Sequence, residues 1–116
     1  MEYKYINPEY LEKVTAGDSE IMKEIVDLFR EQVAESYTQM LSYLDTGDYY
    51  NLGMLAHKVK SSVSIMGMTD LASMLKTFEL QAKESKETGM FRSYIERYGN
   101  ETAMALKELE DLIKKY

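Results

Sequence analysis

The chain has 116 residues, a length that suits one domain with a single core, and it contains no cysteine. The absence of cysteine excludes a disulfide framework, a thiol nucleophile and a cysteine-based metal site. Twenty acidic residues against fourteen basic ones give a net charge of −6. This acidic excess argues against a nucleic-acid-binding protein, which needs a basic face for phosphates.

From Met1 to Lys4 the N-terminus carries two charged residues and a tyrosine, where a signal peptide needs an apolar run. No later stretch approaches the roughly 18 apolar residues of a membrane span. We therefore expect a soluble, cytoplasmic protein that does not enter a membrane.

Glycines and a single proline divide the chain into segments with apolar residues at helical spacing. Asn7 and Pro8 predict the start of a short helix that ends near Gly17. Asp18 predicts the cap of a second helix, and Gly47 its end. The apolar residues of this second helix follow at steps of three and four: Met22, Ile25, Phe29, Val33, Tyr37, Met40 and Leu44.

A third helix is predicted over residues 48–66, with Asp48 as its cap and Gly67 as the left-handed residue that ends it. Thr69 predicts the cap of a fourth helix. The apolar stripe of the third helix is Leu52, Leu55, Ala56, Val59, Val63 and Met66. The stripe of the fourth helix is Leu71, Leu75, Phe78 and Ala82.

A turn around Lys86 to Gly89 precedes the last helix, whose stripe is Phe91, Ile95, Tyr98, Thr102, Ala105, Leu109, Leu112 and Tyr116. Gly99 and Asn100 lie inside this run without breaking its phase, so we predict one helix, with a cost of about 1 kcal/mol for the glycine. The predicted fold class is all-α, in one domain over residues 1–116. Its architecture is an up-down antiparallel four-helix bundle with a short extra N-terminal helix.

His57 is the only histidine, and helical spacing places it opposite the apolar stripe of the third helix. Lys60, Ser61 and Ser64 fall on the same outward face. Residues 49–69 contain no acid, although about three or four would be expected from the composition of the chain. We therefore expect the surface around His57 to be locally positive.

An imidazole on a rigid helix can act as a nucleophile, because its neutral form has a nitrogen lone pair that can attack phosphorus. A phosphoryl group on His57 would need a nearby cation, and Lys60 at i+3 supplies one. Ser61 at i+4 is small, and Gly53 at i−4 should keep the other side open. This face should therefore have space for a phosphoryl group and a partner protein.

The sequence lacks the residues that metal, triad or ATP-dependent chemistry would need. A di-iron bundle needs Glu-x-x-His pairs, but the residue three positions before His57 is Met54. One histidine makes a poor metal site, and no acid lies near His57 on its own helix to form a Ser-His-Asp triad. No glycine-rich phosphate loop for ATP is present. We therefore expect no bound metal or cofactor and no kinase activity.

Apolar side chains beside His57 suggest a docking surface for another protein. Met54 and Ile65 flank this face, and Met68 follows the turn. The alternative is that neighbouring helices cover these residues. The complete predicted docking set is Gly53, Met54, Lys58, Ser61, Ser64, Ile65, Gly67 and Met68.

The run from Ala56 to Gly67 resembles the signature of histidine-containing phosphotransfer (HPt) domains. That signature is Ala-His-x-aliphatic-Lys-Gly-Ser/Ala, with a further glycine ten residues after the histidine. Leu71, Leu75 and Glu79 continue the resemblance into the next helix. The segments 10–18 and 25–29 resemble the opening of the family, so the resemblance covers nearly the whole chain.

The resemblance implies a carrier that takes a phosphoryl group from a receiver-domain aspartate and passes it to another. It implies phosphorylation of His57 and stabilisation of the phosphoryl group by Lys60. The implied partners are response-regulator receiver domains, which supply the Mg²⁺, and a hybrid sensor kinase. It also implies a monomer. Ser61 stands where the family usually has glycine.

Two functions from different classes remain open at this stage. The first is a phosphorelay intermediate. The second is a non-catalytic helical interaction module that docks receiver domains without being phosphorylated, for which Ser61 is the best support. The start at Met1 and the position of the last helix favour a free-standing protein over part of a sensor kinase.

Overall fold

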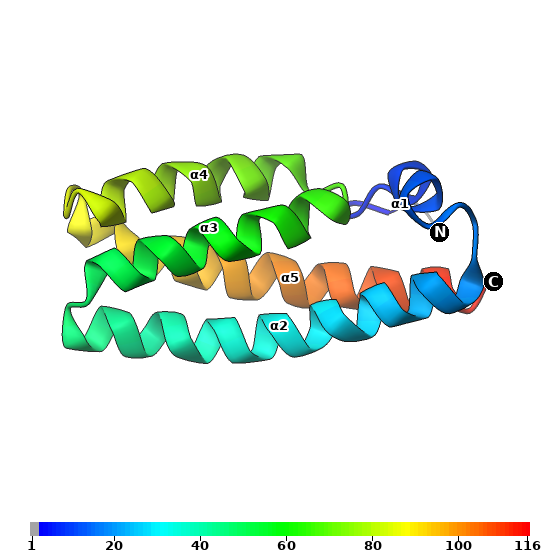
Figure 1. Ribbon diagram of the computed structural model, residues 1–116, viewed down its shortest axis with the longest axis horizontal. Coiled ribbons are helices and arrows are strands. Elements are labelled where there is room, and N and C mark those ends of the chain that lie inside the picture. The colour runs from blue at the N-terminus through cyan, green and yellow to red at the C-terminus, as the bar shows by residue number, and fades with distance from the viewer. Residues whose placement is uncertain (1–2) are drawn as a thin grey trace.

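The computed structural model describes residues 3–116, which form four long helices and one short one (Figure 1). The long helices run antiparallel along a molecule of 43 × 21 × 21 Å, and the short α1 lies at the end where α2 begins. This arrangement confirms the predicted up-down bundle. The elements are α1 (Pro8–Thr15), α2 (Ser19–Thr46), α3 (Tyr49–Ile65), α4 (Thr69–Lys83), the 3-10 turn η1 (Thr88–Met90) and α5 (Phe91–Ile113).

Short-range capping sets most of the helix ends, as the sequence predicts. The side chains of Asn7, Asp18 and Asp48 accept hydrogen bonds from backbone N–H groups in the first turns of α1, α2 and α3. Gly47 follows α2 with a left-handed φ of +72°. These caps satisfy N–H groups that have no partner within their own helix.

The corner between α3 and α4 packs against the segment before α1. Gly67 has a φ of +80°, and a Cβ there would lie 2.3 Å from the Cβ of Asn7, so only glycine fits. The backbone N–H of Asn7 also donates to the carbonyl of Met66 at 3.0 Å. Two predictions at this corner are wrong. Met68 is buried in the core rather than exposed for docking, and Thr69 is the first residue of α4 rather than its cap.

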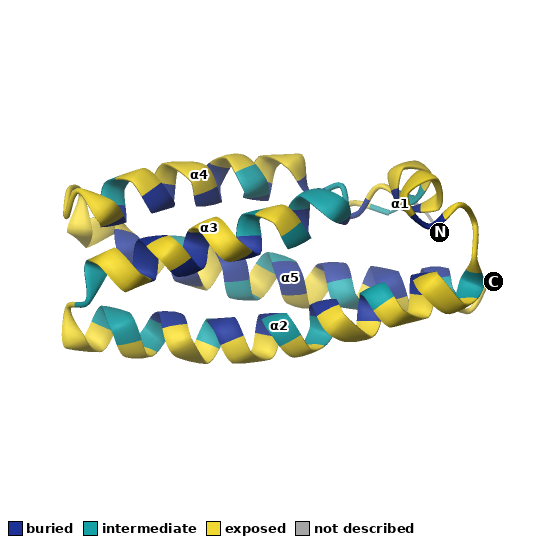
Figure 2. Cartoon of the chain, in the orientation of Figure 1, coloured by how far each residue is buried: buried dark blue, intermediate teal, exposed yellow. Residues whose placement is uncertain are grey.

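The core lies along the axis of the bundle, where the apolar stripes of the four long helices meet (Figure 2). The stripes predicted for α4 and α5 are buried, except for Tyr116, which lies beyond the end of α5. In α2, burial also includes Val26 and Ser36, which the predicted stripe omitted. The Ser36 hydroxyl lies 2.9 Å from that of Tyr98, so these two buried polar groups satisfy each other. Within residues 3–116, no helix is both long and apolar enough to cross a membrane.

A buried carboxylate on α5 fixes the segment before α1. Glu108 accepts hydrogen bonds from the backbone N–H groups of Lys4, Tyr5 and Ile6 at 2.9, 2.9 and 3.1 Å. Its side chain is therefore satisfied although it lies in the core. These bonds attach the N-terminal segment to the end of the bundle.

Gly53 allows close packing between α3 and α4. A Cβ at this position would lie 3.0 Å from the carbonyl oxygen of Glu79 and 3.0 Å from Cγ of Lys83. The prediction that Gly53 keeps the His57 face open to a partner is therefore wrong. Gly53 is buried, and its missing side chain leaves room for the backbone of α4.

Candidate functional site

His57 lies on the outward face of α3, with 57% of its side chain exposed, as predicted. Its Nδ1 is 3.0 Å from each carboxylate oxygen of Glu79 on α4. Its Nε2, on the other side of the ring, has no hydrogen-bond partner among residues 3–116. One ring nitrogen is thus fixed against the protein and the other is available for chemistry.

Glu79 is a buried carboxylate with three donors around it. Only 9% of its side chain is exposed. Besides His57, Nζ of Lys60 lies 3.4 Å from Oε1 and Nζ of Lys83 lies 2.8 Å from Oε2. The prediction of a locally positive surface without an acid is therefore wrong in one respect. Residues 49–69 contain no acid, but α4 places a carboxylate directly beside the histidine.

The contacts of Glu79 determine which nitrogen of His57 carries the proton. Burial alone would raise the pKa of Glu79, but the hydrogen bonds from Lys83 and His57 and the charges of His57 and Lys60 outweigh it and lower this pKa to about 2. The carboxylate is ionised at neutral pH and can only accept hydrogen bonds. Nδ1 of His57 must therefore donate, so a neutral ring has its lone pair on Nε2.

The other predicted residues of this face differ in where they lie. Lys60, Ser61, Ser64 and Ile65 line an open groove between α3 and α4, and the Ser64 hydroxyl donates to the carbonyl of Lys60 at 2.9 Å. Met54 is 43% exposed on α3, one turn before the histidine. Gly53, Gly67 and Met68 instead belong to packing contacts within the bundle.

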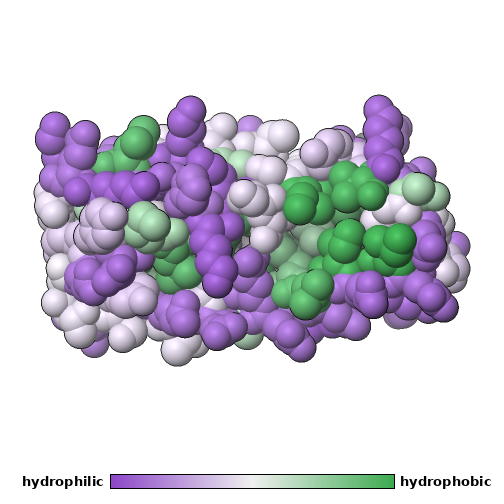
Figure 3. Space-filling model, viewed as in Figure 1, coloured by the Kyte–Doolittle hydropathy of each residue, from purple (hydrophilic) through white to green (hydrophobic). Residues whose placement is uncertain are grey.

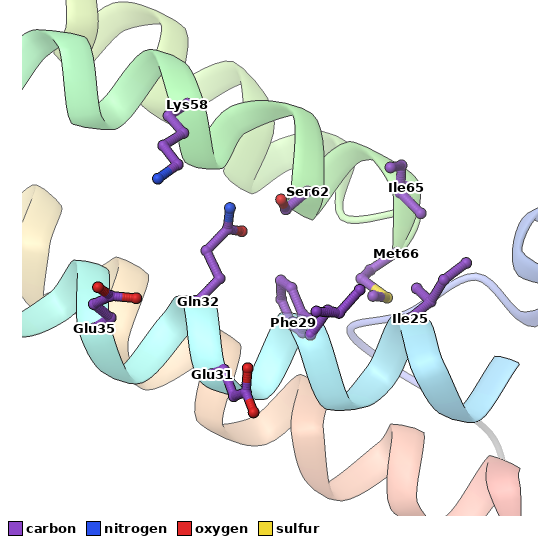
Figure 4. Close-up of a pocket in the computed structure, with 10 residues that line it drawn as sticks. Ile25, Phe29, Glu31, Gln32, Glu35, Lys58, Ser62, Ile65 and Met66 are labelled. Carbon is purple, nitrogen blue, oxygen red and sulfur yellow. The ribbon is translucent and has the colours of Figure 1, made fainter. Parts of the chain in front are cut away.

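An apolar groove of about 470 Å³ runs between α2 and α3 (Figures 3 and 4). The sequence predicts docking residues on its α3 side but none on its α2 side. The predicted residues Lys58 and Ile65 line it from α3. Ile25, Leu28 and Phe29 line it from α2. Leu28 is 65% exposed and lies off the buried stripe of α2. A leucine outside the apolar stripe is the sequence feature that indicates this side of the groove.

The same groove contains an unsatisfied polar atom. The side-chain oxygen of Gln32 is buried and has no hydrogen-bond partner in the described part of the chain. Figure 4 shows its amide pointing into the groove between Lys58 and Ser62.

Replacing Glu79 with glutamine should remove a pH-dependent part of the stability. The pKa of Glu79 is about 2 in the folded protein against an ordinary value of 4.5, so ionisation stabilises the fold above pH 4.5. This contribution is lost as the pH falls from 4.5 to about 2. Wild type should exceed Glu79→Gln in free energy of unfolding by about 3 kcal/mol at neutral pH. Urea denaturation at a series of pH values measures this; a difference that stays constant down to the folded-state pKa would contradict it.

Comparisons with known proteins agree with this fold. Residues 24–115 match the family model described as "Hpt domain". The crystal structure of histidine-containing phosphotransfer protein B (HptB) from Pseudomonas aeruginosa PAO1 is similar to this structure, with a TM-score of 0.88 and 22% identity over 99% of each chain. No curated protein matches the chain by sequence. Because the family model covers most of the chain, this protein belongs to the Hpt domain family of histidine phosphotransfer proteins.

Proposed function

We propose that His57 accepts a phosphoryl group from a receiver-domain aspartate and passes it to a second receiver, within a two-component phosphorelay. The observation that carries this proposal is the hydrogen bond from Nδ1 of His57 to Glu79. It directs the lone pair of the neutral ring to Nε2, on a side chain that is 57% exposed. Membership of the Hpt domain family supports the same assignment.

The transfer step needs no proton from this chain. The lone pair of Nε2 forms the N–P bond, while the P–O bond of the aspartyl phosphate breaks and its electron pair leaves on the aspartate carboxylate. Nδ1 keeps its proton, so the ring of His57 becomes positive beside the negative carboxylate of Glu79. Lys60, three residues further along α3, offers an ammonium group to the phosphoryl oxygens.

The partner surface in this proposal combines the His57 face with the groove between α2 and α3. Leu28 and Ile65 offer apolar area. Lys58, Glu31 and Glu35 line the same groove and offer charges of both signs to a receiver. The receiver would supply the Mg²⁺, and a hybrid sensor kinase would supply phosphoryl groups to the relay. In this scheme the chain is a carrier without kinase activity of its own. A monomeric state and a cytoplasmic location stay predictions.

Phosphoryl transfer from a phosphorylated receiver domain should label the wild type but not His57→Gln, because glutamine has no nucleophilic ring nitrogen. Lys60→Ala should slow the transfer by about tenfold or more, since it removes a cation from the phosphoryl group. Radiolabel on the protein after mixing measures both effects, and the label should be lost in acid but stable in base. Full labelling of His57→Gln would refute the assignment. Receiver binding without any label would favour the interaction module, and Ser61→Gly would then be the first variant to test.

Leu28→Glu should weaken binding of the receiver by about tenfold, because it places a charge in the apolar part of the proposed docking surface. The fold should persist, since Leu28 is mostly exposed. Isothermal titration calorimetry measures the Kd, with Met104→Glu as a matched control at an exposed apolar position on α5. Equal affinities for both variants and the wild type would rule out docking at this groove.

A further inference from the structure

Two lysines share the single carboxylate of Glu79, and they approach it differently. Nζ of Lys83 lies 2.8 Å from Oε2, an ordinary hydrogen-bond length, whereas Nζ of Lys60 lies 3.4 Å from Oε1, near the limit for such a bond. Both side chains are partly buried, at 32% and 27% exposed. One ammonium group neutralises the charge of one carboxylate. In the unphosphorylated protein, Glu79 therefore has a second ammonium group beside it that is not required for charge balance.

The two lysines belong to different helices, which separates their roles. Lys83 lies on α4, four residues after Glu79, and this spacing places both side chains on one side of the helix. Lys60 lies on α3, three residues after His57, on the side of the nucleophile. Lys83 is thus attached to the helix of the carboxylate, and Lys60 to the helix of the reacting nitrogen.

Packing restricts the stem of Lys83. Its Cγ lies 3.0 Å from the position that a Cβ on Gly53 would occupy, so the stem crosses α3 where that helix has no side chain. The missing side chain at Gly53 therefore gives Lys83 a direct path to Glu79.

We infer that Lys83 is the permanent partner of Glu79, whereas Lys60 moves from Glu79 to the phosphoryl oxygens when His57 is phosphorylated. This inference rests on the proposed function. Once Lys60 has moved, Lys83 is the one lysine left to hold the carboxylate in place to accept the hydrogen bond from Nδ1. The negative carboxylate then stabilises the ring of His57, which phosphorylation has made positive. Lys83 is a positioning residue: it acts through Glu79 and forms no bond to the phosphoryl group.

The protonated nitrogen of His57 tests the role of Lys83 in the unphosphorylated protein. The ¹⁵N resonances of both ring nitrogens give the share of neutral rings with a proton on Nδ1. Lys83→Gln should lower this share and Lys83→Arg should restore it. Lys60→Gln should change it less than Lys83→Gln does, and Lys86→Gln, a matched exposed lysine just after α4, should not change it. An unchanged share in Lys83→Gln, or an equal loss in Lys60→Gln, would overturn the inference.

Transfer kinetics test the exchange itself. Lys83→Gln should slow transfer from a phosphorylated receiver by about fivefold, with unchanged receiver affinity, and Lys83→Arg should restore most of the rate. On phosphorylation, the ¹⁵Nζ resonance of Lys60 should shift while that of Lys83 stays. A wild-type rate in Lys83→Gln, or a shift of the Lys83 resonance instead, would contradict the exchange. If wild type accepts no phosphoryl group, the proposed function fails, and the ¹⁵N measurement on His57 still decides whether Lys83 fixes Glu79.

Discussion

The His57 site depends on the hydrogen bond between Nδ1 of His57 and the buried carboxylate of Glu79. Burying a carboxylate is unfavourable unless hydrogen bonds and opposite charges compensate, and here donors from α3 and α4 provide both. The compensation lowers the pKa of Glu79 to about 2, which leaves it an acceptor at any physiological pH. The position of the proton on the neutral ring of His57, and with it the nitrogen that carries the lone pair, follows from this one ionised group. The close packing of α3 on α4 at Gly53 makes the contact geometrically feasible.

A second buried carboxylate, Glu108, holds the N-terminal segment in place by accepting hydrogen bonds. It binds three consecutive backbone N–H groups in the segment before α1 and thereby fixes that segment to α5. The same segment contacts the corner after α3 through Asn7 and Gly67. The end of the helix that carries His57 is therefore anchored by local backbone geometry and by a distant helix. A rigid helix of this kind can present a side chain to a partner protein in a defined orientation.

Features with local causes could be predicted from the sequence, and features that arise between helices could not. Caps such as Asp18 and the period of the apolar stripes depend on neighbouring residues, so they were predicted with few errors. Glu79 on α4 contacts His57 on α3, and a contact between two helices is not visible in the sequence. Two signals marked Glu79: its place in the resemblance to HPt domains, and its position beside Phe78 on the buried side of α4. Gly53 was interpreted as open space, because a sequence does not show which backbone approaches a glycine.

The measurement that tests this account most directly is the identity of the phosphorylated atom. Phosphorylated protein labelled with ¹⁵N at the histidine ring can be examined by NMR for coupling between ³¹P and each ring nitrogen. If Glu79 holds the proton on Nδ1, the phosphoryl group must be bonded to Nε2 of His57, and the coupling should appear at that nitrogen alone. Coupling to Nδ1, or a phosphoryl group on any other side chain, would contradict the account.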